Sequence, residues 1–175
     1  DLWKELKGIF LQAVFHNKCA YCEGKYVAGY AEHVEHYRPK KEITEARQSI
    51  AHNGYFWLAY EWQNLLLACA NCNSSHSSYQ NGKKVSHPGK LNEFRVSGGR
   101  VLKPSANPPD WMTDLDAEKP LLLNPYFDEP EKDIGFDDKG FPYPKGGSER
   151  GKETIDVCHL DRPELVEARM ENINE

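Results

Sequence analysis

The chain has 175 residues, of which 39% are apolar and 28% are charged, and its formal net charge is -5. This composition is typical of a globular domain, and no apolar run approaches the roughly 20 residues of a membrane helix. The negative total argues against a protein that binds nucleic acid by charge alone. No basic-then-apolar leader resembling a signal peptide opens the sequence, and the missing initiator Met suggests a fragment or a numbering that begins inside the gene product. The cysteines are not spaced as in a secreted disulfide scaffold, so we expect a cytoplasmic protein.

The charges are unevenly distributed along the chain. Residues 1–75 are balanced, whereas residues 104–175 carry 18 acids against 8 Lys or Arg. Between them, residues 76–103 carry one acid and six basic residues, which we call the basic band: Lys83, Lys84, Lys90, Arg95, Arg100 and Lys103. This asymmetry indicates nucleic acid near the basic band and a different partner for the acidic part.

The first half of the chain predicts short mixed elements. Apolar residues recur every three or four positions from Leu2 to Val14, which predicts an amphipathic helix ending near Asn17. The β-branched and aromatic residues of 26–37 favour a strand or short hairpin, and 41–53 is helical or irregular.

The segment 55–62 holds five aromatic residues. A base-stacking surface is one interpretation, and burial in the core is the commoner one for aromatics so closely spaced. The apolar run "LLLAC" then predicts a buried strand, and "NCNSSHSSYQN" predicts a short helix.

Proline and glycine dominate the next part of the chain. Nine of the eleven prolines follow residue 103, so we expect 104–150 to be extended and irregular, interrupted by the apolar "PLLLNPYF". Asp161 and Glu164 form a capping pair with Pro163 between them, which predicts a final helix through about Ile173.

Four of the five cysteines form two CxxC pairs: Cys19, Cys22, Cys69 and Cys72. Two such pairs, 46 residues apart, predict one structural zinc ion held by four thiolates. Redox-active pairs are the competing interpretation, but neither pair has the flanking βαβ pattern that a thioredoxin-like unit requires. Cys158 stands alone in an apolar context and is predicted to be a small buried residue.

The segments "CAYC", "VEHYRPK" and "WQNLLLACANCN" together resemble the HNH endonuclease family. The resemblance implies a ββα-metal finger over about 19–82 and an α+β fold. This zinc-stabilised HNH core would be preceded by a helix and followed by the irregular segment and the C-terminal helix. We therefore divide the chain into an HNH nuclease domain, 1–103, and an acidic region, 104–175, that can dock a partner.

The same resemblance assigns roles to individual residues. His36 matches the general base, because a neutral imidazole can accept a proton from water near pH 7. Glu35 and Asn73 match ligands of one catalytic Mg²⁺ or Mn²⁺ ion, for which oxygen donors are suited. Asn64 matches the central Asn, which orients the His36 ring or braces its loop.

Several further assignments are less determined. His76, expected one helical turn after Asn73, is either a further ion ligand or a solvent-facing residue. Arg38 and Lys40 are expected phosphate contacts, together with Lys83 and Lys84 of the basic band. His33 would point away from His36 on a strand, so we interpret it as structural.

A longer set of segments, including "GYFWLAYEW", "PLLLNPY" and "GKETIDV", resembles the HNH nuclease subunit of Septu-type anti-phage systems, alone or attached to retrons. That resemblance implies an effector nuclease that cuts nucleic acid, most simply DNA, and is controlled by an ATPase subunit. The alternative is a zinc-stabilised adaptor that binds nucleic acid or a protein without cutting.

Overall fold

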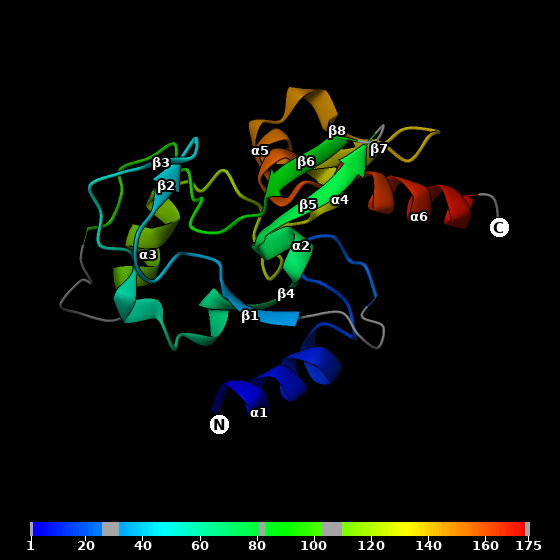
Figure 1. The fold of residues 1–175 in the computed structure, drawn as a ribbon. Helices are drawn as coiled ribbons and strands as arrows, with labels where there is room; N and C mark the ends of the chain where they lie inside the picture. The colour runs from blue at the N-terminus through cyan, green and yellow to red at the C-terminus, as the bar shows by residue number, and fades with distance from the viewer. Residues whose placement is uncertain (1, 26–31, 81–82, 103–109, 174–175) are drawn as a thin grey trace.

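The computed structural model describes residues 2–25, 32–80, 83–102 and 110–173, and it shows a mixed α and β fold of short elements (Figure 1). Each named sheet is a two-stranded antiparallel pair. The α-helices are α1 (Leu2–Ile9), α2 (Ala70–Asn73), α3 (Asp110–Ala117), α4 (Pro130–Asp133), α5 (Glu149–Cys158) and α6 (Pro163–Ile173). The strands are β1 (Glu32–His36), β2 (Thr44–Glu45), β3 (Gln48–Ser49), β4 (Leu65–Cys69), β5 (Ser75–Gln80), β6 (Lys83–Pro88), β7 (Ile134–Phe136) and β8 (Pro142–Pro144). Short π- or 3-10 turns are η1 (Phe10–Val14), η2 (Phe56–Leu58), η3 (Trp62–Asn64) and η4 (Lys145–Gly147).

The centre of the molecule is the antiparallel pair of β1 and β4, followed directly by α2. The apolar run "LLLAC" forms β4 as the sequence predicts, because a continuous apolar strand can be covered on both faces. The register places Glu32 opposite Cys69 and His36 opposite Leu65. Two strands and a helix therefore succeed one another in the predicted order, while their identification as a ββα-metal finger stays a prediction.

Alternation along β1 separates its side chains between two environments. His33 and Glu35 lie on the face whose β4 partners belong to the main hydrophobic core. Val34 and His36 alternate to the opposite face. Phe10 of η1 covers that second face, where it is fully buried against the apolar residues of β4. The N-terminal helix thus continues as a π-helix to Val14, somewhat short of the predicted end.

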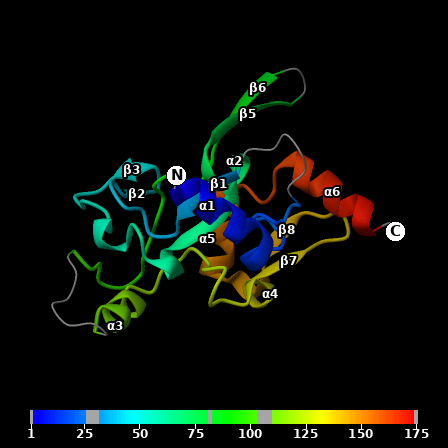
Figure 2. The same ribbon diagram turned by 90° about the horizontal axis from the view of Figure 1, so that it is seen from below.

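The chain after α2 departs from the predicted helix. The helix ends at Asn73, Ser74 is extended with ψ 159°, and the serine-rich segment pairs with β6 as a hairpin. Serine competes for backbone hydrogen bonds and is a weak helix former, so the cross-strand ladder prevails. The prediction of a helix through this segment is wrong beyond Asn73. Figure 2 shows β5 and β6 extending away from the body of the molecule.

The segment 41–53, expected to be helical or irregular, contains the small hairpin of β2 and β3. Its turn places Ala46 and Arg47 at φ 49° and 65°, a conformation typical of tight turns. The predicted final helix is confirmed as α6, with Pro163 as its first residue. The preceding α5 begins after Ser148, whose hydroxyl accepts a hydrogen bond from the Gly151 amide.

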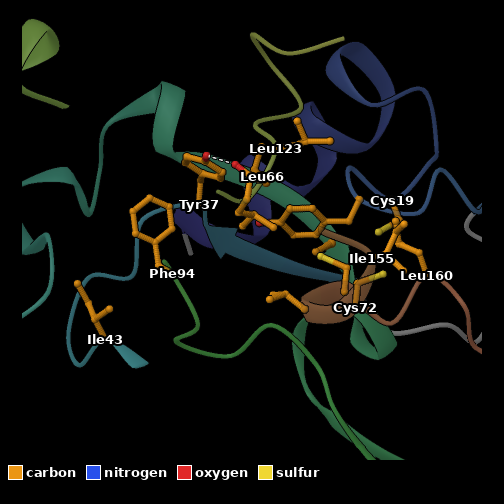
Figure 3. Close-up of a cluster of buried hydrophobic side chains, with 14 of the residues drawn as sticks. Cys19, Tyr37, Ile43, Leu66, Cys72, Phe94, Leu123, Ile155 and Leu160 are labelled. Carbon is orange, nitrogen blue, oxygen red and sulfur yellow. Dashed lines mark hydrogen bonds between the residues drawn. The ribbon is translucent and has the colours of Figure 1, made fainter. Parts of the chain in front are cut away.

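The region 104–175 shares its hydrophobic core with the first half of the chain. Leu123, Ile155 and Leu160 belong to the same buried cluster as Tyr37, and Figure 3 shows these side chains together. The Tyr37 hydroxyl donates to the Leu122 carbonyl at 2.6 Å. The three leucines of "PLLLNPYF", Leu121, Leu122 and Leu123, are therefore buried within this chain. A partner-docking role for the region stays a proposal.

One buried carboxylate holds the two halves together. Glu118 is fully buried and pairs with the Arg38 guanidinium, 3.1 Å from Nε. It also accepts hydrogen bonds from the Tyr55 hydroxyl at 2.6 Å and the Val101 amide at 2.8 Å. Arg38 in turn donates to the Leu115 carbonyl. Because the Glu118 side chain is 0% exposed and that of Arg38 only 11%, losing either one leaves the charge of the other without compensation.

Replacing Glu118 by alanine should lower the free energy of unfolding by about 3–5 kcal/mol, the usual cost of breaking a buried pair. Urea denaturation of the zinc-loaded protein measures this change. The control is Glu129→Ala, which removes an exposed pair with Lys132 and should cost about 1 kcal/mol or less. Equal losses in the two variants would contradict the role given to Glu118.

Candidate functional site

The four CxxC cysteines converge at one end of the β1–β4 pair. Cys19 and Cys22 lie in a tight turn after η1, where the Glu23 amide donates to the Cys19 carbonyl. Cys69 ends β4 and Cys72 lies in α2, so the second pair spans a strand-to-helix junction. Figure 3 shows Cys19 and Cys72 at the edge of the buried cluster.

The geometry of this cluster fits a zinc ion. The four sulfur atoms lie within 4.8 Å of one another, and those of Cys22 and Cys69 are 3.9 Å apart. A tetrahedral zinc with Zn–S bonds of about 2.3 Å places its sulfurs roughly 3.8 Å apart. No disulfide joins the cysteines of the described residues. The prediction that both CxxC pairs form one cluster is confirmed, and the cluster can hold a zinc ion.

The thiols of the cluster differ in acidity. Hydrogen bonds with the neighbouring thiols, that of Cys19 first, lower the pKa of Cys22 and bring that of Cys69 to about 7. The pKa of Cys19 is raised, chiefly by its hydrogen bond to Cys22. Part of the cluster is therefore ready to ionise near neutral pH, as a metal-binding thiolate site requires.

Arg162 contributes a positive charge to the same cluster. Its guanidinium lies 3.4 Å from the Cys72 sulfur and 3.8 Å from the Cys69 sulfur, and it also donates to the carbonyls of Cys158 and His159. Burial by itself lowers the pKa of Arg162, but the nearby thiolates more than offset this and raise it. Arg162 therefore joins the C-terminal helices to the cysteine cluster through N–H···S hydrogen bonds and charge.

His36 lies at the last position of β1, with its ring fixed by a backbone group. Its Nε2 lies 3.0 Å from the Ala59 carbonyl, and since a carbonyl only accepts, Nε2–H is the donor. The other ring nitrogen, Nδ1, then carries the lone pair in the neutral ring. Burial lowers the pKa of His36 and nearby Lys40 lowers it further, against the opposing effect of the Ala59 hydrogen bond. The ring is thus neutral at pH 7.

Asn64 braces the loop that follows His36. Its amide oxygen accepts from the Arg38 amide at 2.7 Å, and its amide nitrogen donates to the carbonyls of Arg38 and Leu58 at 3.1 and 3.2 Å. The Asn64 backbone carbonyl accepts from the Tyr37 amide. Because Leu58 directly precedes Ala59, Asn64 fixes both the loop after His36 and the carbonyl that orients the His36 ring.

Glu35 has a different partner from the one expected. Its carboxylate lies 2.6 Å from the Lys90 ammonium, which is fully buried. Lys90 also donates to the His36 carbonyl at 3.0 Å. The lysine belongs to the basic band of the sequence, but in the structure it compensates a buried carboxylate.

The other two expected ion ligands have separate partners. The Asn73 amide lies 3.2 Å from the His33 ring, which agrees with the structural role predicted for His33. His76 lies on β5 rather than on a helix, and its ring stacks on that of His87 with centroids 5.0 Å apart. Among the His, Cys, Asp and Glu side chains of the described residues, only the four cysteines form a group of three or more ready to bind a metal. In this arrangement Glu35, Asn73 and His76 each contact a different side chain, and the Lys90 ammonium lies at the Glu35 carboxylate.

The basic band does not form one continuous surface. Arg95 pairs with Glu153, and Arg100 pairs with Glu45. Lys103 lies outside the described residues, whereas Lys83 and Lys84 are exposed on β6. Of the other two expected phosphate contacts, Arg38 is held by Glu118 and Lys40 is half-buried.

The aromatic segment around Ala59 is only partly core. Tyr55 is fully buried, as the commoner interpretation predicts, but Phe56 and Tyr60 are 59% and 72% exposed. Trp62 is 44% exposed, although its ring packs on that of Phe10 with the two ring centroids 4.9 Å apart. Exposed aromatic surface therefore lies on the segment that holds the His36 ring.

Two residues of the site were missed by sequence reasoning. Lys90 was grouped with surface charges, and Arg162 stood in an ordinary helix-start pattern. Their partners lie 55 and about 90 positions away in the sequence. No local spacing rule connects residues so far apart, so only the fold could identify them.

Replacing Arg162 by methionine should weaken zinc affinity by about ten-fold or more, the usual effect of losing a partner of a metal ligand. Transfer of zinc from the loaded protein to a chromogenic chelator measures this loss. Arg169→Met is the matched control, because that guanidinium donates to the carbonyls of Gly140 and Leu160. Equal zinc release from the two variants would show that Arg162 does not stabilise the cluster.

No helix in the described part of the chain is long and apolar enough to cross a membrane. No protein-family model matches the sequence, and no solved structure is significantly similar to it.

Three curated relatives are similar over most of the chain. Septu protein PtuB of Bacillus mycoides (strain KBAB4) is 36% identical over 91% of this chain and 48% of its own length. Septu protein PtuA of the same strain is 30% identical over 95% of this chain and 20% of its own length. Septu protein PtuB of Bacillus thuringiensis is 27% identical over 89% of this chain and 41% of its own length. The chain is thus similar to Septu proteins and spans about half the length or less of those it matches.

Proposed function

We propose that this chain is the HNH-type nuclease part of a Septu anti-phage defence system, and that it hydrolyses phosphodiester bonds of nucleic acid, in the first place DNA. The observation that carries the proposal is the His36 ring, neutral and held through Nε2–H by a backbone carbonyl. A ring fixed in this tautomer is prepared to act as a general base through Nδ1. The similarity to Septu proteins supports the biological setting.

The chemical step follows from this tautomer. A water at Nδ1 would give its proton to His36 while its oxygen attacks phosphorus and the bond to the leaving sugar oxygen breaks. Asn64 serves this step indirectly, because it holds both the loop after His36 and the segment that supplies the Ala59 carbonyl. A base fixed by its surroundings loses little orientational freedom in the transition state.

The resemblance to HNH enzymes also implies a catalytic Mg²⁺ or Mn²⁺ ion, with Glu35, Asn73 and His76 as its expected ligands. These residues are directed to Lys90, His33 and His87, so their present arrangement does not fit that ion. The reaction steps assigned to the chain are therefore those of His36 and of the residues that position it.

Substrate contacts are proposed on two surfaces. Lys83 and Lys84 lie exposed on the hairpin that extends from the body (Figure 2), where ammonium groups can contact phosphates. Phe56 and Tyr60 expose aromatic surface on the segment that holds His36, where unstacked bases can pack. Both kinds of contact are independent of base sequence.

A partner subunit is part of the proposal. We infer that the region 104–175 contacts an ATPase subunit that controls the nuclease. Its exposed aromatic residues support such a contact: Phe127, Phe136, Phe141 and Tyr143 are each about half exposed or more. The competing function, a zinc-stabilised adaptor without catalysis, is separated from this one by the His36 experiment below.

His36→Asn should lower the rate of plasmid cleavage in Mg²⁺ by at least about 100-fold, because asparagine can still donate to Ala59 but cannot accept the proton. The control is His16→Asn at an exposed histidine, which should leave cleavage unchanged. Zinc content and circular dichroism establish that both variants are folded. Equal cleavage by the two variants would exclude His36 as the base and favour the adaptor.

Lys83→Ala combined with Lys84→Ala should weaken DNA binding for all sequences and make it less dependent on salt. Losing two phosphate contacts should reduce the magnitude of the slope of log K against log salt by up to about 2. Fluorescence anisotropy with a labelled duplex at several salt concentrations measures both quantities. Lys132→Ala with Lys139→Ala removes the same charge from exposed positions in the acidic region and serves as the control. If only the control pair weakens binding, DNA contacts the acidic region instead.

A further inference from the structure

We propose that the Lys90 ammonium is the resident cation of the Glu35 carboxylate, and that a divalent ion can bind Glu35 only after Lys90 has been displaced. This inference rests on the proposed function only in that HNH chemistry places a divalent ion at Glu35. The chain as described would then be a nuclease whose ion site is closed by one of its own side chains.

The surroundings of Lys90 resemble those of a bound hard cation. Its ammonium lies 2.6 Å from the Glu35 carboxylate, 3.0 Å from the His36 carbonyl and 3.4 Å from the Leu91 carbonyl. An ammonium has three hydrogens and no acceptor, so three oxygens saturate it. Carboxylate and carbonyl oxygens are also the donors that Mg²⁺ and Mn²⁺ use. The lysine therefore contacts the kinds of oxygen that such an ion binds, and it shares one residue, Glu35, with the expected ion site.

Lys90 cannot instead serve as a phosphate contact in this position. Its side chain is 0% exposed, and its three oxygen partners are all in the protein. A substrate phosphate has no access to the ammonium unless the side chain moves. Its effect on the reaction must then pass through Glu35 and through the backbone of His36.

Charge makes the two cations mutually exclusive. A divalent ion bound to Glu35 would lie within a few ångström of the ammonium, and in a buried site that repulsion is only weakly screened. The carboxylate carries one negative charge, which the ammonium already neutralises. Ion binding therefore requires the lysine side chain to rotate away or its segment to shift.

The backbone holds Lys90 firmly in place. The Lys90 amide donates to the Cys72 carbonyl at 2.7 Å, and the Leu91 amide donates to the Asn73 carbonyl at 2.9 Å. A side chain on Gly89 would come within 2.6 Å of the Ser74 backbone, so only glycine allows this close approach. Leu91 has φ 50°, an uncommon conformation for a leucine.

This segment also continues directly from β6, the strand that carries Lys83 and Lys84. A movement of the hairpin can therefore reach Lys90 through a short stretch of chain. A buried ion pair stabilises a fold no better than apolar residues of similar size would. Stability alone therefore does not explain why a lysine and a glutamate are paired here.

Binding of Mn²⁺ to the zinc-loaded protein, measured by electron paramagnetic resonance without nucleic acid, tests the proposal. The wild type should have no site that depends on Glu35, so Glu35→Gln should leave its Mn²⁺ binding unchanged. Lys90→Met, which removes the ammonium and leaves an apolar side chain one atom shorter, should gain one Mn²⁺ site per chain that binds at least ten-fold tighter than any Mn²⁺ on the wild type. Adding Glu35→Gln to Lys90→Met should remove that site.

The matched control is Lys145→Met, which removes an exposed ammonium and should gain no Mn²⁺ site. Zinc content and thermal unfolding report whether each variant is folded. A folded Lys90→Met variant without the new site would overturn the proposal. Wild-type Mn²⁺ binding that Glu35→Gln abolishes would also overturn it, and this comparison decides the question even if Lys90→Met does not fold.

The readout is ion binding rather than cleavage, so it is independent of the nuclease assignment. If His36→Asn leaves cleavage unchanged while Lys90→Met gains the Mn²⁺ site, the proposed function fails and the inference about Lys90 holds. If cleavage depends on His36 while Lys90→Met gains no Mn²⁺ site, the proposed function holds and the inference about Lys90 fails.

Discussion

The convergence of four sulfur atoms is the constraint on which the rest of the site depends. The first CxxC pair lies in an otherwise irregular turn, and the second joins the end of β4 to α2. Because Cys69 is paired with Glu32 in the β1–β4 register, the position of the cluster also sets the position of β1. Four thiolates around zinc can supply folding free energy that such short elements lack. The strand that carries Glu35 and His36 is therefore positioned by chemistry at its opposite end.

Adjacent residues of β1 then acquire contrasting environments through alternation alone. His36 is neutral, contacts a backbone carbonyl and lies on the face covered by the N-terminal helical segment. Glu35 faces the main core, where its charge is matched by Lys90. Strand geometry thus directs the imidazole of His36 and the carboxylate of Glu35 to opposite faces, although the two residues are adjacent. The Lys90 ammonium bridges the two, since it also binds the His36 carbonyl.

The C-terminal region is an integral part of this arrangement and not a separate appendage. Glu118 compensates Arg38, Glu153 compensates Arg95, and Arg162 lies against the cysteine sulfurs. Many of the charges that make the sequence look divided into basic and acidic parts are therefore paired with one another inside one structure. The exposed basic residues that remain on the hairpin are a smaller and better defined surface than the band in the sequence.

The sequence by itself determined the elements whose signals are local. Two CxxC pairs identified the cysteine cluster that can hold a metal ion, an apolar run identified β4, and a capping pair with proline identified α6. It also singled out His36 and Asn64. In the structure the His36 ring donates to the Ala59 carbonyl, and the Asn64 side chain holds the loop after His36. These features depend on spacing and residue type within a few positions, which a linear pattern records.

The tertiary structure alone decided which charges meet and which residues face one another. Lys90 and Arg162 acquired their roles from partners far along the chain, and His76 was moved from a predicted helix to a strand by pairing with β6. A salt bridge or a hydrogen bond to sulfur acts over a few ångström, whereas the number of possible long-range pairings in 175 residues is large. Only folding around the cysteine cluster and the buried core selects among them, because that packing fixes which distant segments are neighbours.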